Sequence, residues 1–241
     1  VNRLQVTSNN LANSETFGFK ADQVTTAQRL PARLEGGFAS DPHYMLEMLG
    51  GGQLSDPTRF MMQQGSLTPT QGELDLAIDG SGFFMVSDGA GREADIRLTR
   101  DGRFTRDPQG ELAMLGTGMK VLDDRQRTIE VPPGPLTVGP DGLVTQGDEE
   151  LGRIGMVSIP DTNSLRKIGD SLIDPGSQVG EMVQANDSTL WQGYLESSTV
   201  KPVLEMAGLV EIGRAVEANA KLMQAQDLLT GQAINTFGKV T

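Results

Sequence analysis

Residues 74–86 read LDLAIDGSGFFMV, and this stretch decides the fold class. Apolar side chains alternate with polar or small ones over residues 74–78, as in a strand with one buried face. Asp79 and Gly80 then form a turn dipeptide, and the apolar run at residues 83–86 follows as a second strand. The stretch therefore predicts a β-hairpin.

The same alternation of short strands and turn residues continues toward the C-terminus. Helical periods do not alternate with these strands, which disfavours a parallel α/β sheet and favours a mostly antiparallel β domain over residues 73–192. Two more hairpins are predicted, one from 96–99 and 103–105 around Asp101-Gly102, the other from 136–138 and 143–145 around Pro140-Asp141-Gly142; single strands are predicted at 111–114, 119–122, 128–131 and 155–159.

Both ends of the chain carry a helical period instead. Steps of three and four residues separate the apolar or small side chains near each terminus, which predicts an amphipathic helix at each end and an α+β fold. The first helix is expected to stop near Asn13, and the second to run from about Val203 to Leu229, with Gly231 just past its end. The stripes are Val1, Leu4, Ser8 and Leu11 at the start, and Met206, Leu209, Gly213, Val216, Ala220 and Met223 at the end.

Residues 20–72 show no sustained period, with scattered prolines and a glycine triplet at 50–52. An extended connecting segment is expected there, with short strands around 44–49 and 59–62. The predicted division is thus a helix and turn at 1–19, a connector at 20–72, the β domain at 73–192, and a connector with helix at 193–241. Because a helical spacing already runs at Val1, the natural chain is expected to begin further upstream.

Composition excludes several functional classes. The net charge of −12 and the lack of a basic run argue against nucleic-acid binding, and the absence of cysteine excludes disulfides and thiolate metal sites. No apolar stretch is long enough for a membrane-spanning helix, and the N-terminus shows no cleavable export signal.

The sequence predicts no enzyme, cofactor or metal site. His43 is the single histidine, and Ser81 lies in a hairpin turn that is no nucleophile elbow. The Gly116-Thr117-Gly118 segment lacks the third glycine and following helix of a dinucleotide site. The acidic groups at residues 123–124 and 148–150 lack the ligand spacing of a calcium loop, so solvated turns are favoured.

Two apolar helical stripes need partners, either each other within a monomer or helices of neighbouring copies. Periodicity alone does not separate these alternatives. A third possibility, a monomeric β-rich carbohydrate-binding or hydrolytic domain, requires a concave aromatic or carboxylate-lined site. The aromatic content of 5% counts against it.

Residues 9–20 carry a specific motif: Asn-Asn-Leu-Ala-Asn, a threonine three residues later, and Gly-Phe-Lys. This segment resembles the N-terminal signature of the flagellar rod and hook protein family. Residues 74–84, 99–104 and 193–198 are similar to the same family, so the resemblance spans nearly the whole chain. Residues 200–206 are most similar to proximal rod subunits, although Leu98 and Thr199 replace the Tyr and Asn usual at their positions.

The resemblance implies an axial subunit whose terminal helices pack into the inner tube of the rod, with the β domain outside. Its partners would be other copies of itself, other rod proteins and the flagellar type III export apparatus, and the rod would cross the periplasm. A distal rod or hook subunit is the alternative within the family. The predicted assembly residues are Val1, Leu4, Asn9, Asn10, Leu11, Asn13, Thr16, Gly18, Phe19, Met206, Leu209, Gly213, Val216, Ala220 and Met223.

Overall fold

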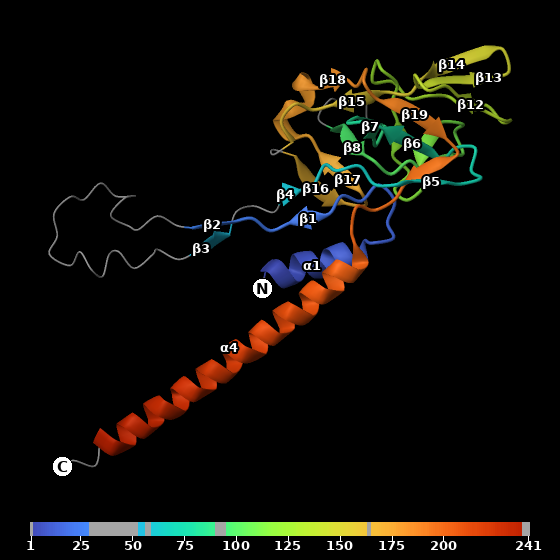
Figure 1. The fold of residues 1–241 in the computed structure, drawn as a ribbon. Coiled ribbons are helices and arrows are strands. Elements are labelled where there is room, and N and C mark those ends of the chain that lie inside the picture. Colours follow the sequence, from blue (N-terminus) through green and yellow to red (C-terminus); the bar gives the residue numbers. More distant parts are fainter. Residues whose placement is uncertain (1, 29–52, 56–58, 90–94, 163–164, 238–241) are drawn as a thin grey trace, which may run out of the picture. The chain divides into compact units, whose positions relative to one another are not determined.

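The structure is a computed structural model that describes residues 2–28, 53–55, 59–89, 95–162 and 165–237. The chain divides into two compact units (Figure 1). The helical unit combines Val1–Ala12 with Lys201–Thr241, and the β unit comprises Asn13–Val200. The predicted α+β class is confirmed. Assembly of the helices into an axial bundle and the four-part division of the chain remain predictions.

The described part of the helical unit consists of two α-helices, α1 (Asn2–Ala12) and α4 (Pro202–Phe237). The first helix ends next to Asn13, as predicted, but the prediction that α4 ends before Gly231 is wrong. A single glycine costs a helix roughly 1 kcal/mol, and the uninterrupted backbone hydrogen bonds on both sides carry α4 through it. Within the described residues, neither helix is long and apolar enough to span a lipid bilayer.

The β unit is built around one large sheet in which every described strand pairing is antiparallel. Its central strand is β7 (Phe83–Ser87), which β8 borders on one edge while β11 and β15 share the other. The other strands of this sheet are β8 (Arg97–Thr99), β9 (Phe104–Arg106), β10 (Leu112–Met114), β11 (Lys120–Val121), β15 (Met156–Ser158), β16 (Arg166–Gly169), β17 (Leu172–Asp174) and β18 (Val183–Gln184).

The β unit also contains smaller antiparallel sheets, and a 3-10 helix, η3 (Gly176–Glu181), precedes β18. The small sheets pair β12 (Thr137–Val138), β13 (Leu143–Gln146) and β14 (Glu149–Arg153); β6 (Leu76–Asp79) and β19 (Thr189–Gln192); β5 (Leu67–Pro69) and β20 (Tyr194–Glu196); β1 (Asp22–Gln23) and β4 (Arg59–Phe60); and β2 (Thr26–Gln28) and β3 (Gln53–Ser55).

Two hydrophobic clusters lie on opposite faces of β7, whose side chains are all buried. Successive side chains of a strand point to opposite faces. Accordingly, Phe84 and Val86 join one cluster, where Phe84 meets Phe104 edge to face at 5.0 Å, while Phe83 and Met85 join the other. The apolar run at residues 83–86 is therefore a core strand that is buried on both faces.

The hairpin predicted around Asp79-Gly80 is wrong. β6 pairs with β19 near the end of the β unit, and the neighbours of β7 occupy both of its edges. The hairpin predicted around Asp101-Gly102 is wrong for a related reason. Its two strands join different partners, and the backbone N–H of Leu76 donates to the Gly102 carbonyl at 3.0 Å, so this corner packs against β6.

The hairpin around Pro140-Asp141-Gly142 is confirmed, with Val138 opposite Val144. Predicted strands at 111–114, 119–122 and 155–159 correspond to β10, β11 and β15. Residues 128–131 form only isolated bridges at Thr128 and Glu130. The predicted strand at 44–49 lies outside the described residues, and β4 occupies part of 59–62.

Candidate assembly site

The two terminal helices, α1 and α4, lie against each other (Figure 1). The Nδ2 of the buried Asn10 donates to Glu205 Oε1 at 3.2 Å, and a Cβ placed on Gly208 would lie 3.8 Å from the Thr7 methyl group. Further along, Arg3 lies 4.0 Å from a carboxylate of α4, but this pair is exposed. Residues 10, 7 and 3 of α1 thus contact residues 205, 208 and 211 of α4 in that order, so the two helices run antiparallel.

The predicted apolar stripe of α1 is not the face that meets α4. Leu4 is 39% exposed, Leu11 is half-buried and Asn9 is exposed. At about 100° per residue, Leu4 and Leu11 project roughly a quarter-turn away from the face that carries Thr7 and Asn10. Val1 lies outside the described residues. The described residues of this stripe therefore remain at least partly exposed after the two helices have paired.

The predicted stripe of α4 is covered only near its start. Leu209 and Gly213 are half-buried, whereas Met206, Val216 and Met223 are about half exposed or more, at 48%, 57% and 61%. From Arg214 to Thr230 every residue is exposed, Ala220 among them.

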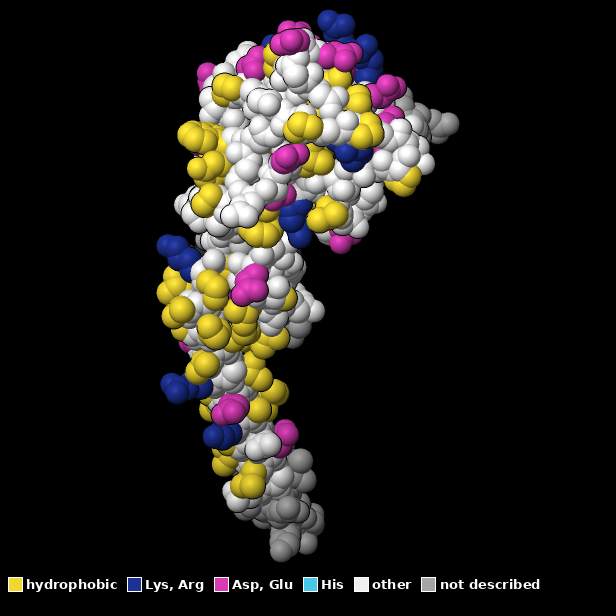
Figure 2. Space-filling model, turned by 90° about the vertical axis from the view of Figure 1, so that its right-hand side faces the viewer, with side chains coloured by type: hydrophobic (Ala, Val, Ile, Leu, Met, Phe, Trp, Pro, Cys, Tyr) yellow, Lys and Arg dark blue, Asp and Glu magenta, His cyan; other side chains and the backbone are white. Residues whose placement is uncertain are grey.

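Exposed apolar side chains are not confined to the predicted stripe of α4. Figure 2 shows hydrophobic side chains along the length of the helix. These exposed apolar side chains form two additional groups around the helix axis. The groups lie at roughly 150° and 250° from the face of α4 that meets α1. The first group is Val203, Val210 and Leu228, and the second is Leu204, Leu222 and Leu229.

The predicted residues at 13–19 belong to the β unit, not to the helical unit. Thr16 donates from its hydroxyl to Asn13 Oδ1 and from its backbone N–H to the Asn13 carbonyl, both at 3.2 Å. Gly18 has φ +68°, the left-handed region, and its N–H donates to the Glu196 carbonyl at 2.7 Å. Phe19 is buried in a small cluster with Ala21 and Val200.

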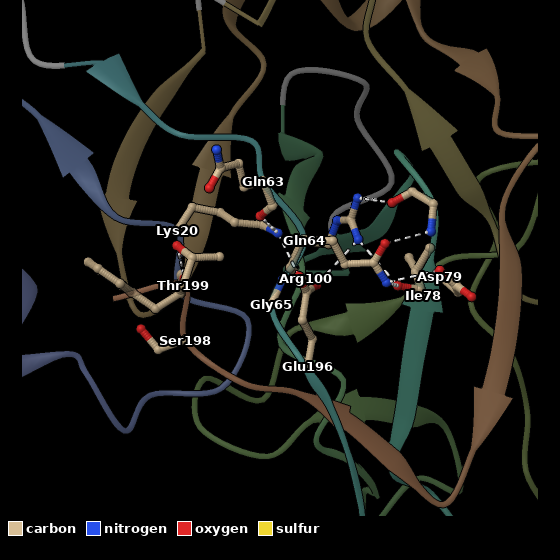
Figure 3. A network of polar contacts seen from close by, with 12 residues as sticks. Lys20, Gln63, Gln64, Gly65, Ile78, Asp79, Arg100, Glu196, Ser198 and Thr199 are labelled. Carbon is tan, nitrogen blue, oxygen red and sulfur yellow. Dashed lines mark hydrogen bonds and ion pairs between the residues drawn. The ribbon is translucent and has the colours of Figure 1, made fainter. Parts of the chain in front are cut away.

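A buried ion cluster joins this segment to two distant ones (Figure 3). Glu196 Oε1 accepts from Lys20 Nζ at 2.6 Å and from the backbone N–H of Gly65 at 2.7 Å. Glu196 Oε2 lies 3.3 Å from Arg100 Nη1. The three charged side chains are only 1–2% exposed, so water screens them little.

This cluster holds two positive charges against one carboxylate. Backbone carbonyls complete its hydrogen bonding: Lys20 donates to Gln63 O at 2.7 Å, and Arg100 donates to Gly80 O at 2.6 Å. The Arg100 guanidinium also lies 5.2 Å from the centre of the Phe83 ring, within cation–π range. Loss of the Glu196 charge would therefore leave two like charges buried beside each other.

Sequence analysis did not single out Lys20, Arg100 or Glu196. Each lies in one of the separate motifs on which the family resemblance rests, and only the fold brings the three together. One signal was available, because each motif places a charge beside residues suited to burial, as with Phe19 and Lys20. Thr199, which departs from the family pattern, supplies a hydroxyl that accepts from the Ala21 N–H at 2.8 Å.

Lys167 supports the same region from β16. Its Nζ donates to the Lys20 carbonyl and, at 2.7 Å, to Asp22 Oδ1, and it lies 4.0 Å from the centre of the Phe19 ring. Burial lowers the pKa of Lys167 and of Lys20 below the ordinary value of 10.5. The neighbouring carboxylates, Asp22 and Glu196, only partly oppose this effect of burial.

These two pKa values predict that the protein becomes more stable as pH rises toward 10.5. Because each folded-state pKa lies below the unfolded-state value, the unfolded chain binds more protons in the window between them. The free energy of unfolding should rise by up to about 1.4 kcal/mol per pH unit for each lysine. Urea unfolding between about pH 8 and about pH 10 measures this, and a Lys20→Met, Lys167→Met double variant should flatten the dependence. Equal slopes in both proteins would contradict the assignment.

The residues set aside as enzymatic or metal-binding lie in turns and ion pairs. Ser81 is exposed in the loop between β6 and β7, and residues 148–150 are exposed at the start of β14. Asp123 accepts from the Arg127 side chain at 2.8 Å. The described residues hold no group of His, Cys, Asp and Glu side chains arranged to bind a metal, and His43 lies outside them.

Comparison with known proteins places this arrangement in a family. Residues 77–146 match the flagellar hook protein FlgE/F/G D1 domain, and residues 192–236 match the flagellar basal body rod FlgEFG protein C-terminal family. The chain is 38% identical to the flagellar basal-body rod protein FlgF of Caulobacter vibrioides, over 98% of this chain and 92% of that protein. It is 30% identical to the flagellar basal-body rod protein FlgG of Bacillus subtilis, over 97% of this chain and 92% of that protein.

The chain therefore belongs to the flagellar basal-body rod protein family, which is structural and not enzymatic. Within that family it is FlgF-like: FlgF proteins of Caulobacter vibrioides, Mesorhizobium japonicum and Rhizobium meliloti are 31–38% identical to it.

Proposed function

We propose that many copies of this chain assemble through their terminal helices into the proximal part of the rod, which transmits torque across the periplasm. The observation that carries this proposal is the distribution of apolar side chains on α4. A helix that is apolar on all sides is stable only when it is buried on all sides. One neighbouring helix covers one side, so the three apolar directions of α4 require several neighbours.

The charge distribution supports the same proposal. The helical unit has five basic and four acidic residues, while the β unit has 15 basic and 28 acidic ones. Helical units with almost no net charge pack together without strong mutual repulsion, and the acidic β units keep the assembly soluble. The helices are thus suited to an inner tube and the β units to its outer surface.

Helix length also supports a role in a bundle. At 1.5 Å per residue, the 36 residues of α4 extend about 54 Å, whereas the 11 residues of α1 extend only about 16 Å. The antiparallel pair thus leaves most of α4 for contacts beyond α1. The stripe of α1 with Leu4 and Leu11 offers one further surface for a neighbouring helix.

The proximal position is proposed from the likeness to FlgF, because three FlgF proteins are 31–38% identical to the chain, whereas FlgG of Bacillus subtilis is 30% identical. Export through the flagellar type III apparatus is part of the proposal. A distal rod or hook position is the alternative within the family.

Deletion of the gene tests the function. We expect nonmotile cells whose basal bodies lack a complete rod in electron micrographs, and restoration of both features by a plasmid copy. Labelling of the plasmid-borne protein should place it in the rod next to the motor. Complete rods and normal swimming in the deletion strain would refute the proposal, and a label at the hook end would favour the alternative position.

A further inference from the structure

Two segments of the β unit lead to the helices: the N-arm, residues 13–21, and the C-arm, residues 194–200. We propose that the ion cluster of Lys20, Arg100 and Glu196 is a mechanical clamp that fixes both arms to the rest of the β unit against sliding under load. This inference rests on the proposed torque-transmitting function, because only a loaded subunit needs such a clamp.

The contacts between the arms point to Glu196 as the centre of the clamp. Its carbonyl accepts the N–H of Gly18 at 2.7 Å, and its side chain binds Lys20, so one residue of the C-arm holds the N-arm twice. Further along, the N–H of Thr199 donates to the Phe19 carbonyl at 3.1 Å. The same carboxylate reaches Gly65 and Arg100, which belong to neither arm.

The chemistry of the cluster is suited to resisting a shift of register. Apolar packing is non-directional, so two segments that are held together only by apolar contacts can slide past each other with little loss of contact. Ion pairs and hydrogen bonds in a dry interior are directional, and sliding by one residue would break them together. For stability alone, well-packed apolar residues serve as well as or better than a buried ion cluster.

A cluster that only stabilises the core and a cluster that acts as a clamp differ in which part of the protein opens when one of the charged side chains is removed. A core cluster is coupled to the whole β unit, so all protected amides would open together. A clamp holds only the arms, so the amides of Gly18, Ala21 and Thr199 would open while the core stays closed. The core amides of Leu112 and Leu122 serve as reporters, because both donate backbone hydrogen bonds at 2.9 Å outside the cluster.

Hydrogen exchange of the Glu196→Gln variant tests this difference. Removing one partner of a buried ion pair should accelerate exchange of the three arm amides by about a hundredfold. These amides should also show a weaker urea dependence of exchange than Leu112 and Leu122, because the arms open without unfolding of the core. Asp141→Asn is the matched control, because it removes an exposed carboxylate that pairs with Arg153 at 2.9 Å, and it should accelerate neither set. An equal urea dependence for all five amides would overturn the clamp.

The Lys20→Met variant keeps the Glu196 to Arg100 pair and provides the test if Glu196→Gln does not fold. We expect about tenfold faster exchange of the same three arm amides, with a weaker urea dependence than that of the core amides. An equal urea dependence for arm and core amides would again overturn the clamp.

Motility under load tests the mechanical role. Cells that carry Lys20→Met should build rods and swim in dilute medium but lose a larger fraction of their speed in viscous medium than cells with Asp141→Asn. Equal losses, or cells without rods, would overturn the clamp. The proposed function would stand in either case, because it is judged by gene deletion and not by these variants.

Discussion

Replacing Val216 by glutamate is expected to abolish rod assembly while leaving the isolated chain folded. Val216 is 57% exposed, and glutamate is a better helix former than valine, so the free energy of unfolding should change by less than about 0.5 kcal/mol. In an assembled bundle, the same position would bury a carboxylate without a partner, at a cost of several kcal/mol in every copy. The expected phenotype is a nonmotile cell without complete rods.

The measurements are electron microscopy of basal bodies, a motility assay, and circular dichroism of the purified variant. Val216→Ile is the matched control, because it keeps an apolar β-branched side chain at the same place and should support swimming. Normal rods with Val216→Glu would show that this side of α4 stays exposed in the assembled protein. A loss of helix content in the purified variant would contradict the expectation of an unchanged monomer.

Replacing Gly18 by alanine is expected to remove a large part of the stability of the β unit. Gly18 has φ +68°, where a residue with a Cβ is strained by roughly 1–3 kcal/mol. The added Cβ would also collide with the backbone of Arg100 and Asp101, which cannot move aside as a flexible side chain would. Together these effects should cost about 3–5 kcal/mol, out of the roughly 5–15 kcal/mol typical of a domain.

Urea unfolding monitored by the fluorescence of Trp191, the single tryptophan, measures this loss. Gly116→Ala is the matched control, because no atom lies within 4 Å of the added Cβ and the backbone there does not need a positive φ. The control should shift the free energy of unfolding by less than about 1 kcal/mol. Equal midpoints for the two variants would contradict the proposed close approach at Gly18.

Local features of the fold were predictable because their physical causes lie within a few residues. The turn at Asp141 and Gly142 joins two strands directly, so its chemistry alone selects the β12–β13 hairpin. The end of α1 follows from Asn13 and the residues after it, which compete with helical hydrogen bonds. The apolar spacing of α4 likewise repeats every three or four residues.

Strand pairing was less predictable, because the edges of a buried strand are open to every other strand of the chain. The turn dipeptide Asp79-Gly80 is compatible with a hairpin of β6 and β7. However, β8, β11 and β15 occupy the edges of β7, and β6 pairs with β19. Which strands win this competition for the edges of β7 depends on which apolar side chains the complete core has to bury. A local pattern does not contain that information.

The sequence by itself determined the periods of the two helices, the strand-rich middle and the turn at Asp141, because each depends on side chains close together along the chain. Only the tertiary structure decided that Lys20, Arg100 and Glu196 share one buried site, and that α1 meets α4 through Thr7 and Asn10 instead of its apolar stripe. The physical reason is that burial of a charge and the choice of a packing face depend on groups that the folded chain brings from distant positions.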